Sequence, residues 1–131
     1  MKILVKCILL FLFSFPLSAD VAKCVDDYNK AIKERQNAKG AYQTAINYKT
    51  RAESYTEKKD NKKLYPKSLE WIKVAIVTLA RARRLLEEVK IGGCPESLKE
   101  NANSLNIKLI NDTAVYDSLR IELERKISML R

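Results

Sequence analysis

The segment from residue 69 to 89, LEWIKVAIVTLARARRLLEEV, constrains the fold most, because its apolar residues lie on two sides of a helix. One set has the three- and four-residue spacing of a helix stripe: Leu69, Ile72, Ile76, Leu79 and Leu86. A second set lies roughly opposite on the helical wheel: Trp71, Val74, Ala82, Leu85 and Val89. A helix that is apolar on two sides needs a neighbour on each. The segment therefore predicts the central helix of a bundle.

Two other long helical patterns supply those neighbours. The first runs from residue 20 to about 59, and its apolar side is rich in alanine and tyrosine. Gly40 lies in its middle, where it allows a kink or close packing. The last begins at Pro95 and Glu96 and carries a heptad-like seam, with Asp112 near the seam as a polar interruption. The seam consists of Leu98, Ala102, Leu105, Leu109, Tyr116, Leu119, Leu123, Ile127 and Leu130.

The connections between these patterns are short. The lysine-rich run 57–63 breaks the apolar period and predicts a solvated connection, with Pro66 just before or within the first turn of the central helix. Gly92 and Gly93 predict the end of that helix, because glycine readily takes the left-handed conformation. Only three glycines and three prolines occur in the chain, as long helices require. We expect an all-α fold of three long antiparallel helices in an up-down-up, coiled-coil-like bundle.

The first nineteen residues have the features of a secretory signal peptide. They begin with Met1 and Lys2, continue in an apolar run from Ile3, and close with small residues at Ser18 and Ala19. Cleavage after Ala19 would leave one domain, 20–131. The alternative is an uncut membrane anchor, but the run is shorter than the roughly 20 residues that span a bilayer. The sequence therefore predicts a secreted or periplasmic protein.

Two cysteines remain in the predicted mature chain. In an up-down-up bundle, the start of the first helix and the connection between the second and third lie at the same end. Cys24 is near that start and Cys94 is in that connection. An even count of cysteines in an exported chain favours a disulfide. We therefore expect a Cys24–Cys94 bond that pins the bundle.

The chain is basic, with 25 lysines and arginines against 16 aspartates and glutamates. Such an excess attracts acidic surfaces without choosing among them. The outer face of the first helix is the candidate polyanion-binding site, formed by Lys30, Lys33, Tyr48, Arg51, Tyr55 and Lys58. A second basic cluster, Arg81, Arg83 and Arg84, lies on the central helix. An anionic envelope polymer or a membrane surface suits an exported protein better than nucleic acid does.

A second apolar stripe lies on the last helix, opposite its seam, and comprises Ile107, Ile110, Ala114 and Ile121. In a monomeric three-helix bundle these side chains would face water, as scattered surface isoleucines commonly do. The alternative is a partner-binding surface, either for a protein partner or for self-association.

Enzyme chemistry is not expected. The chain has no histidine, which is the commonest general base and metal ligand, and a disulfide leaves no thiolate for zinc or catalysis. Three carboxylate pairs occur, but within each pair the side chains diverge around the helix: Asp26–Asp27, Glu87–Glu88 and Glu122–Glu124. We therefore expect no catalytic residue, metal, cofactor or small-molecule substrate. The expected function is binding of a macromolecule, first a protein partner, with a holdase-type chaperone or envelope-polyanion binder as the alternative.

Overall fold

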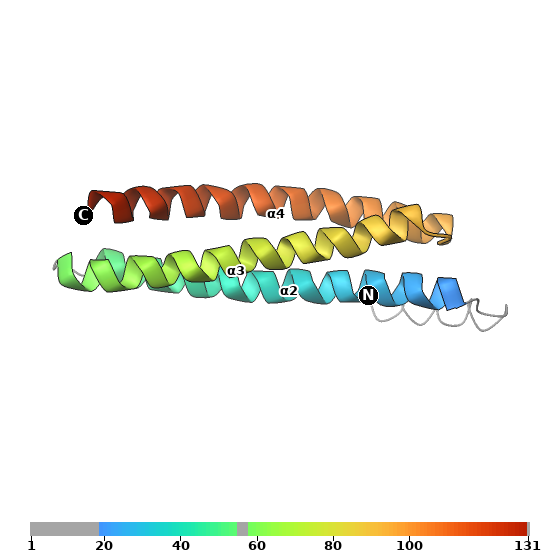
Figure 1. The fold of residues 1–131 in the computed structure, drawn as a ribbon, viewed down its shortest axis with the longest axis horizontal. Coiled ribbons are helices and arrows are strands. Elements are labelled where there is room, and N and C mark those ends of the chain that lie inside the picture. The colour runs from blue at the N-terminus through green and yellow to red at the C-terminus, as the bar shows by residue number, and fades with distance from the viewer. Residues whose placement is uncertain (1–18, 55–57, 131) are drawn as a thin grey trace.

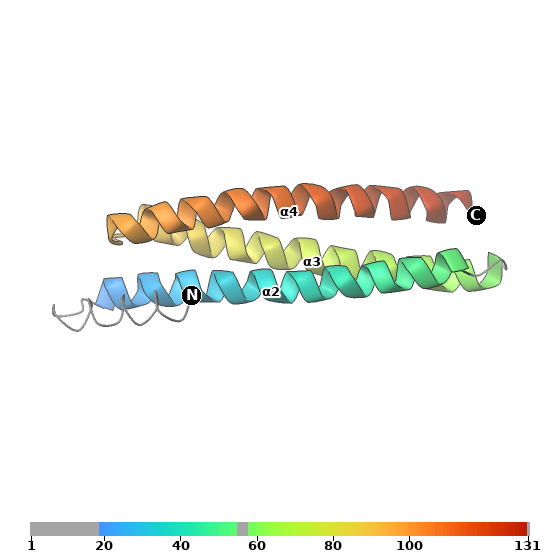
Figure 2. The same ribbon diagram turned by 180° about the vertical axis from the view of Figure 1, so that it is seen from behind.

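The computed structural model describes residues 19–54 and 58–130, and these form three helices with no strand among them. The helices are α2 (Ala19–Ser54), α3 (Lys58–Ile91) and α4 (Glu96–Met129). They run up, down and up along one axis, with α3 between the other two (Figures 1 and 2). The predicted bundle and its central helix are confirmed. No helix within the described part has an apolar stretch long enough to span a membrane, and the predicted signal peptide lies almost wholly outside that part.

The predicted connection at 57–63 is wrong, because residues 58–63 already belong to α3; Lys62 and Lys63 are exposed as predicted, and Glu57 lies outside the described residues. Leu64 and Tyr65 are buried, so packing against the other helices holds this segment helical. Pro66 consequently lies inside α3 rather than just before or within its first turn. Proline within a helix costs about 3 kcal/mol, because it lacks an amide proton and its ring crowds the preceding turn. The burial of its two neighbours offsets that cost.

A seam of small residues holds α2 against α3. Cys24, Ala31, Ala38, Ala45 and Ala52 follow one another at seven-residue intervals on α2, and all five are buried. On α3 the same interval connects four buried residues, Ser68, Ala75, Ala82 and Val89. A heptad repeat keeps one face of a helix against its partner, and small side chains let the two backbones come close.

Ser68 sets the register of this seam. Its hydroxyl donates a hydrogen bond of 2.6 Å to the backbone carbonyl of Ala45 on the facing helix. Because the helices are antiparallel, stepping seven residues in opposite directions brings Ala75 opposite Ala38 and Ala82 opposite Ala31. Gly40, in contrast, is not a site of close packing, since a Cβ atom there would meet nothing within 4 Å.

The second apolar side of α3 is only partly covered. Ala82 and Val89 from the predicted set are buried, and Leu85 is partly buried. Trp71 and Val74, however, are 41% and 47% exposed. Contact with α2 through small side chains occupies a narrow strip of α3, so larger residues further round the helix remain in solvent.

The seam of α4 packs against α3 as predicted. Leu109 and Leu123 are fully buried, and Leu98, Leu105, Tyr116 and Leu119 are nearly so. At the C-terminal end Ile127 and Leu130 are partly buried against the core. The opposite side of α4 therefore faces outward.

Long side chains fill the space between the parallel helices α2 and α4. The Arg35 guanidinium donates to the Asp112 carboxylate at 2.8 Å, which neutralises the polar interruption of the seam. Two turns further along α2 and one turn further along α4, the rings of Tyr42 and Tyr116 stack with centroids 4.4 Å apart. Burial, followed by the charge of Asp112, raises the pKa of Tyr116 to about 12.

The same row continues toward the end of the bundle. Lys49 contacts Glu122 at 3.1 Å, and this hydrogen-bonded pair lowers the pKa of Glu122. Lys126 contacts Glu53 at 3.0 Å, which raises the pKa of the lysine. The facing residues on α2, namely 35, 42 and 49, again follow a seven-residue interval.

The Cys24–Cys94 disulfide closes the other end of the bundle, with Cα atoms 5.8 Å apart, as predicted. The helix α3 ends at Ile91, next to the two glycines, but no described glycine has a positive φ. The predicted left-handed termination is therefore wrong. Gly92 is required for space instead, since a Cβ there would lie 2.9 Å from the Glu88 carbonyl oxygen.

Candidate functional site

The outer face of α4 is the first candidate surface. Ile107, Ile110 and Ile121 are 54%, 44% and 55% exposed, and Ala114 between them is also exposed. All four residues of the predicted apolar stripe therefore lie together on the side of α4 away from its seam. Val115, 54% exposed, extends the apolar surface at one edge.

This outer face is also depleted of charge. Between residues 101 and 121 of α4 the most exposed charged side chains are Lys108 and the pair Asp117–Arg120, which are 45% and 30% exposed and contact each other at 2.7 Å. The remaining polar residues there carry amides or hydroxyls: Asn101, Asn103, Ser104, Asn111 and Ser118. In a chain with 31% charged residues, a stretch of about 30 Å in which Lys108 is the only charge without an ion-pair partner among the described residues is distinctive. Depletion of charge at the core is characteristic of protein–protein interfaces.

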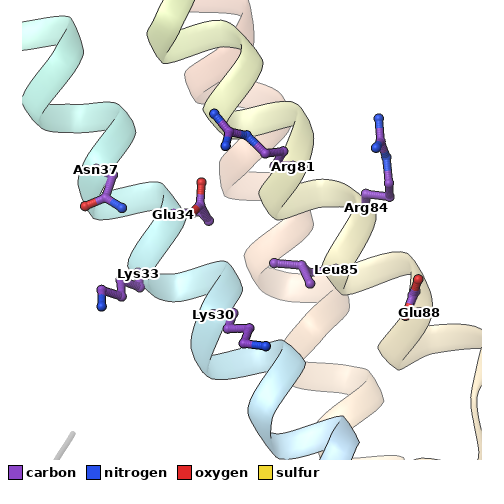
Figure 3. Close-up of a pocket in the computed structure, with 8 residues that line it drawn as sticks. All are labelled: Lys30, Lys33, Glu34, Asn37, Arg81, Arg84, Leu85 and Glu88. Atoms are coloured by element: carbon purple, nitrogen blue, oxygen red, sulfur yellow. The ribbon is translucent and has the colours of Figure 1, made fainter.

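A groove of about 570 Å³ between α2 and α3 is the second candidate surface (Figure 3). Eight residues line it: Lys30, Lys33, Glu34 and Asn37 on α2, and Arg81, Arg84, Leu85 and Glu88 on α3. In Figure 3, Arg81 and Leu85 point toward α2, whereas Lys33 points away from α3. The groove thus combines an apolar side chain on its α3 wall with several cations around it.

Ion pairs neutralise part of this groove. Lys30 contacts Asp26 at 3.0 Å, and that hydrogen bond raises the pKa of the lysine. Glu88 contacts Lys23 at 3.1 Å. Within the described part of the chain, Lys33, Arg81 and Arg84 have no ion-pair partner closer than 4 Å. These three cations at the groove therefore remain available to an external anion, although only Arg81 points toward the facing helix in Figure 3.

The structure divides the basic face that was predicted on the first helix. Lys30 and Lys33 join Arg81 and Arg84 across the groove, whereas Arg83 points to the other side of α3 and donates to Asn106 at 3.4 Å. The sequence did not predict that cations of α2 and α3 line one groove, because their proximity depends on the register of α2 against α3. Glu34, Asn37, Leu85 and Glu88 were missed for the same reason.

The rest of that face lies elsewhere. Tyr48 and Arg51 line a smaller pocket about 22 Å further along α2. The Tyr48 ring lies under the Arg51 guanidinium at 5.6 Å and the Lys67 ammonium at 5.9 Å. Tyr55 lies outside the described residues, and Lys58 is the first residue of α3 rather than part of the first helix.

The carboxylates considered for catalysis are all engaged with cations. Asp26 and Asp27 contact Lys30 and Lys23, respectively, and Glu87 contacts Lys90. Glu124 contacts Arg120 at 3.0 Å. Across the described parts of the three helices, no group of three or more metal-ligating side chains converges.

Comparison with known protein families, with curated proteins and with solved structures finds no match to this chain. The Cys24–Cys94 disulfide is compatible with an oxidising, extracellular compartment. Interpretation of function therefore depends on the two surfaces themselves.

Proposed function

We propose that this protein is a non-enzymatic binding protein whose outer α4 face docks a protein partner. The observation that carries the proposal is the exposure of Ile107, Ile110 and Ile121 on a face where Lys108 is the only charged residue without an ion-pair partner among the described residues. Removing apolar surface from water drives most protein association, and charge depletion avoids the cost of desolvating ions. A solvated lysine- or glutamate-rich face would offer neither advantage.

Burial of the three isoleucines alone does not provide enough free energy for association. Fully burying an isoleucine contributes about 1.5–3 kcal/mol, so burying the exposed half of three contributes roughly 3 kcal/mol. Association costs at least about 4 kcal/mol in lost freedom of motion. The isoleucines alone are therefore insufficient. The partner must also form hydrogen bonds with the amides and hydroxyls along the face, such as Asn103, Asn111 and Ser118.

Photo-crosslinking tests this proposal. Benzoylphenylalanine in place of Ser118 puts a reactive group on the face without altering an isoleucine, and Gln36, exposed on α2, is the control position. In the source cells, we expect irradiation to give a covalent adduct with a protein from position 118 and none from position 36. Ile110→Asp in the same chain should abolish the adduct. Absence of any position-specific adduct would refute the proposal.

A second candidate function is binding of an anionic polymer in the α2–α3 groove. Support comes from Lys33, Arg81 and Arg84, which have no ion-pair partner among the described residues. Such binding would weaken strongly with salt, because the attraction between exposed charges is screened.

Two adjacent arginines provide a matched test on a heparin column. Arg84→Gln and Arg83→Gln remove the same charge, but only Arg84 lines the groove. We expect Arg84→Gln to elute at lower salt than Arg83→Gln, with unchanged helicity in both. Equal elution of the two variants would show that retention depends on net charge alone and would exclude a groove site.

A further inference from the structure

Three residues on the outer face of α4 keep their pattern when the helix is turned end over end, whereas the same turn sets Ile110 opposite Ser118. Ile107 and Ile121 each lie seven residues from Ala114, in opposite directions. Seven residues are nearly two turns, so the three side chains form one line on the exposed side of the helix. A small residue at the centre with an isoleucine at equal distance on each side fits a two-fold axis through Ala114, because each isoleucine then lies opposite the other.

We propose that a second copy of this chain covers this face, with the two α4 helices antiparallel and the two-fold axis at Ala114. The inference rests on the proposed function and names the partner of the same surface. In this arrangement Ile107 of each copy contacts Ile121 of the other. The two Ala114 residues meet at the axis, where their small side chains allow close approach. The α2–α3 seam of the same molecule joins antiparallel helices in the same way, through Ala31, Ala38 and Ala45.

Charges at the two ends of the face select the antiparallel orientation. Glu100, one heptad before Ile107, lies at one end. Arg125, eighteen residues or five full turns after Ile107, lies on the same line at the other end. Both are exposed, and neither has an ion-pair partner among the described residues.

An antiparallel copy brings Glu100 within three residues of Arg125 across the interface, an axial offset of about 4.5 Å that both side chains can bridge. Symmetry gives two such pairs. A parallel copy would instead place Glu100 against Glu100 and Arg125 against Arg125, which is unfavourable.

The size of the face sets the expected strength. It is one helix wide and about 38 Å long from residue 100 to 125. The area of such a strip is smaller than the roughly 800 Å² that each partner buries in a standard stable interface. We therefore expect a reversible dimer whose population rises with protein concentration.

Disulfide trapping at the axis is the direct test. In the oxidised full chain, Ala114→Cys places two thiols across the two-fold axis. Ser118→Cys, on the same face, separates the two thiols by eight residues, about 12 Å along the axis. A disulfide requires Cα atoms within about 7 Å, so the antiparallel dimer predicts rapid cross-linking from position 114 and slow cross-linking from 118. Equal rates from both positions would indicate random collision or a parallel dimer, and either result overturns the proposal.

Charge reversal provides a second test that needs no new cysteine. Glu100→Arg and Arg125→Glu should each weaken dimerisation roughly three- to tenfold in sedimentation equilibrium, and the double variant should restore it. If the double variant is as weak as the singles, the pairing is wrong. The wild-type chain remaining monomeric at millimolar concentration would also overturn it. If the chain is monomeric, a photo-crosslinked adduct from position 118 to a different protein would still support the proposed function. Absence of any adduct would refute both the dimer and the proposed function.

Discussion

Gly92 and Gly93 are adjacent, yet the structure gives them different roles. A methyl group at position 92 would lie 2.9 Å from the Glu88 carbonyl oxygen and 3.5 Å from the Cys94 sulfur, whereas position 93 is open. We expect Gly92→Ala to lower the free energy of unfolding by about 1 kcal/mol or more, because backbone must shift. Gly93→Ala should leave it unchanged or raise it by up to about 1 kcal/mol, because alanine restricts the unfolded chain. Urea denaturation of the oxidised proteins compares them, and equal effects would contradict the packing argument.

Ionisation of Tyr116 lowers the free energy of unfolding at alkaline pH. Its pKa is about 12 in the folded chain and 10 when unfolded. A raised folded pKa contributes stability that is complete below pH 10 and is lost as pH rises toward 12. Tyr116→Phe should therefore reduce the alkaline loss of stability relative to wild type, by less than about 2 kcal/mol because solvent screens part of the effect. Denaturation midpoints at pH 8, 10 and 11.5 test this, and identical pH profiles would contradict the assigned shift.

At the scale of single elements, the α2–α3 seam depends on side-chain size. Ala38 is fully buried in that seam, whereas Ala80 on α3 is exposed. Ala38→Leu should lower the free energy of unfolding by about 1–3 kcal/mol, because the added atoms push the two helices apart. Ala80→Leu introduces the same side chain and should change stability by less than about 0.5 kcal/mol. Thermal unfolding followed by circular dichroism distinguishes the two. A tolerated leucine at position 38 would mean that α2 and α3 are not closely packed.

Other helix-scale features follow from the choice of residues at each interface. The helix α2 presents small residues to α3 and long residues, Arg35, Tyr42 and Lys49, to α4. The first set allows close backbone contact, and the second spans a wider separation with ion pairs and stacked rings. This difference places α3 at the centre of the bundle and leaves one side of α4 free.

For the whole molecule, the disulfide links residues 70 positions apart in sequence. Closing a loop of that length in the unfolded chain accounts for about 4 kcal/mol in the chain-entropy model. We expect replacement of Cys24 and Cys94 by serine to lower the free energy of unfolding by about that amount while the helices remain. Reduction of the wild-type protein should reproduce the effect. Unaltered stability of the double variant would show that packing alone sets the topology.

The sequence by itself determined the class of fold, the order of the three helices, the seam of α4 and the disulfide pairing. These features follow from local periodicity and chain topology. Leu98, Leu105 and Leu119 mark their buried side by spacing alone, and Cys24 and Cys94 must lie at one end of any up-down-up bundle.

Only the tertiary structure decided where α3 begins, which apolar residues stay exposed and which cations line the same groove. The segment before Pro66 becomes helical because Leu64 and Tyr65 find partners in space. Trp71 stays 41% exposed because the alanine seam is narrow. Lys33 and Arg84 share a groove because the Ser68–Ala45 contact fixes how α2 and α3 are aligned. Contacts between distant residues set each of these outcomes, and local spacing does not encode them.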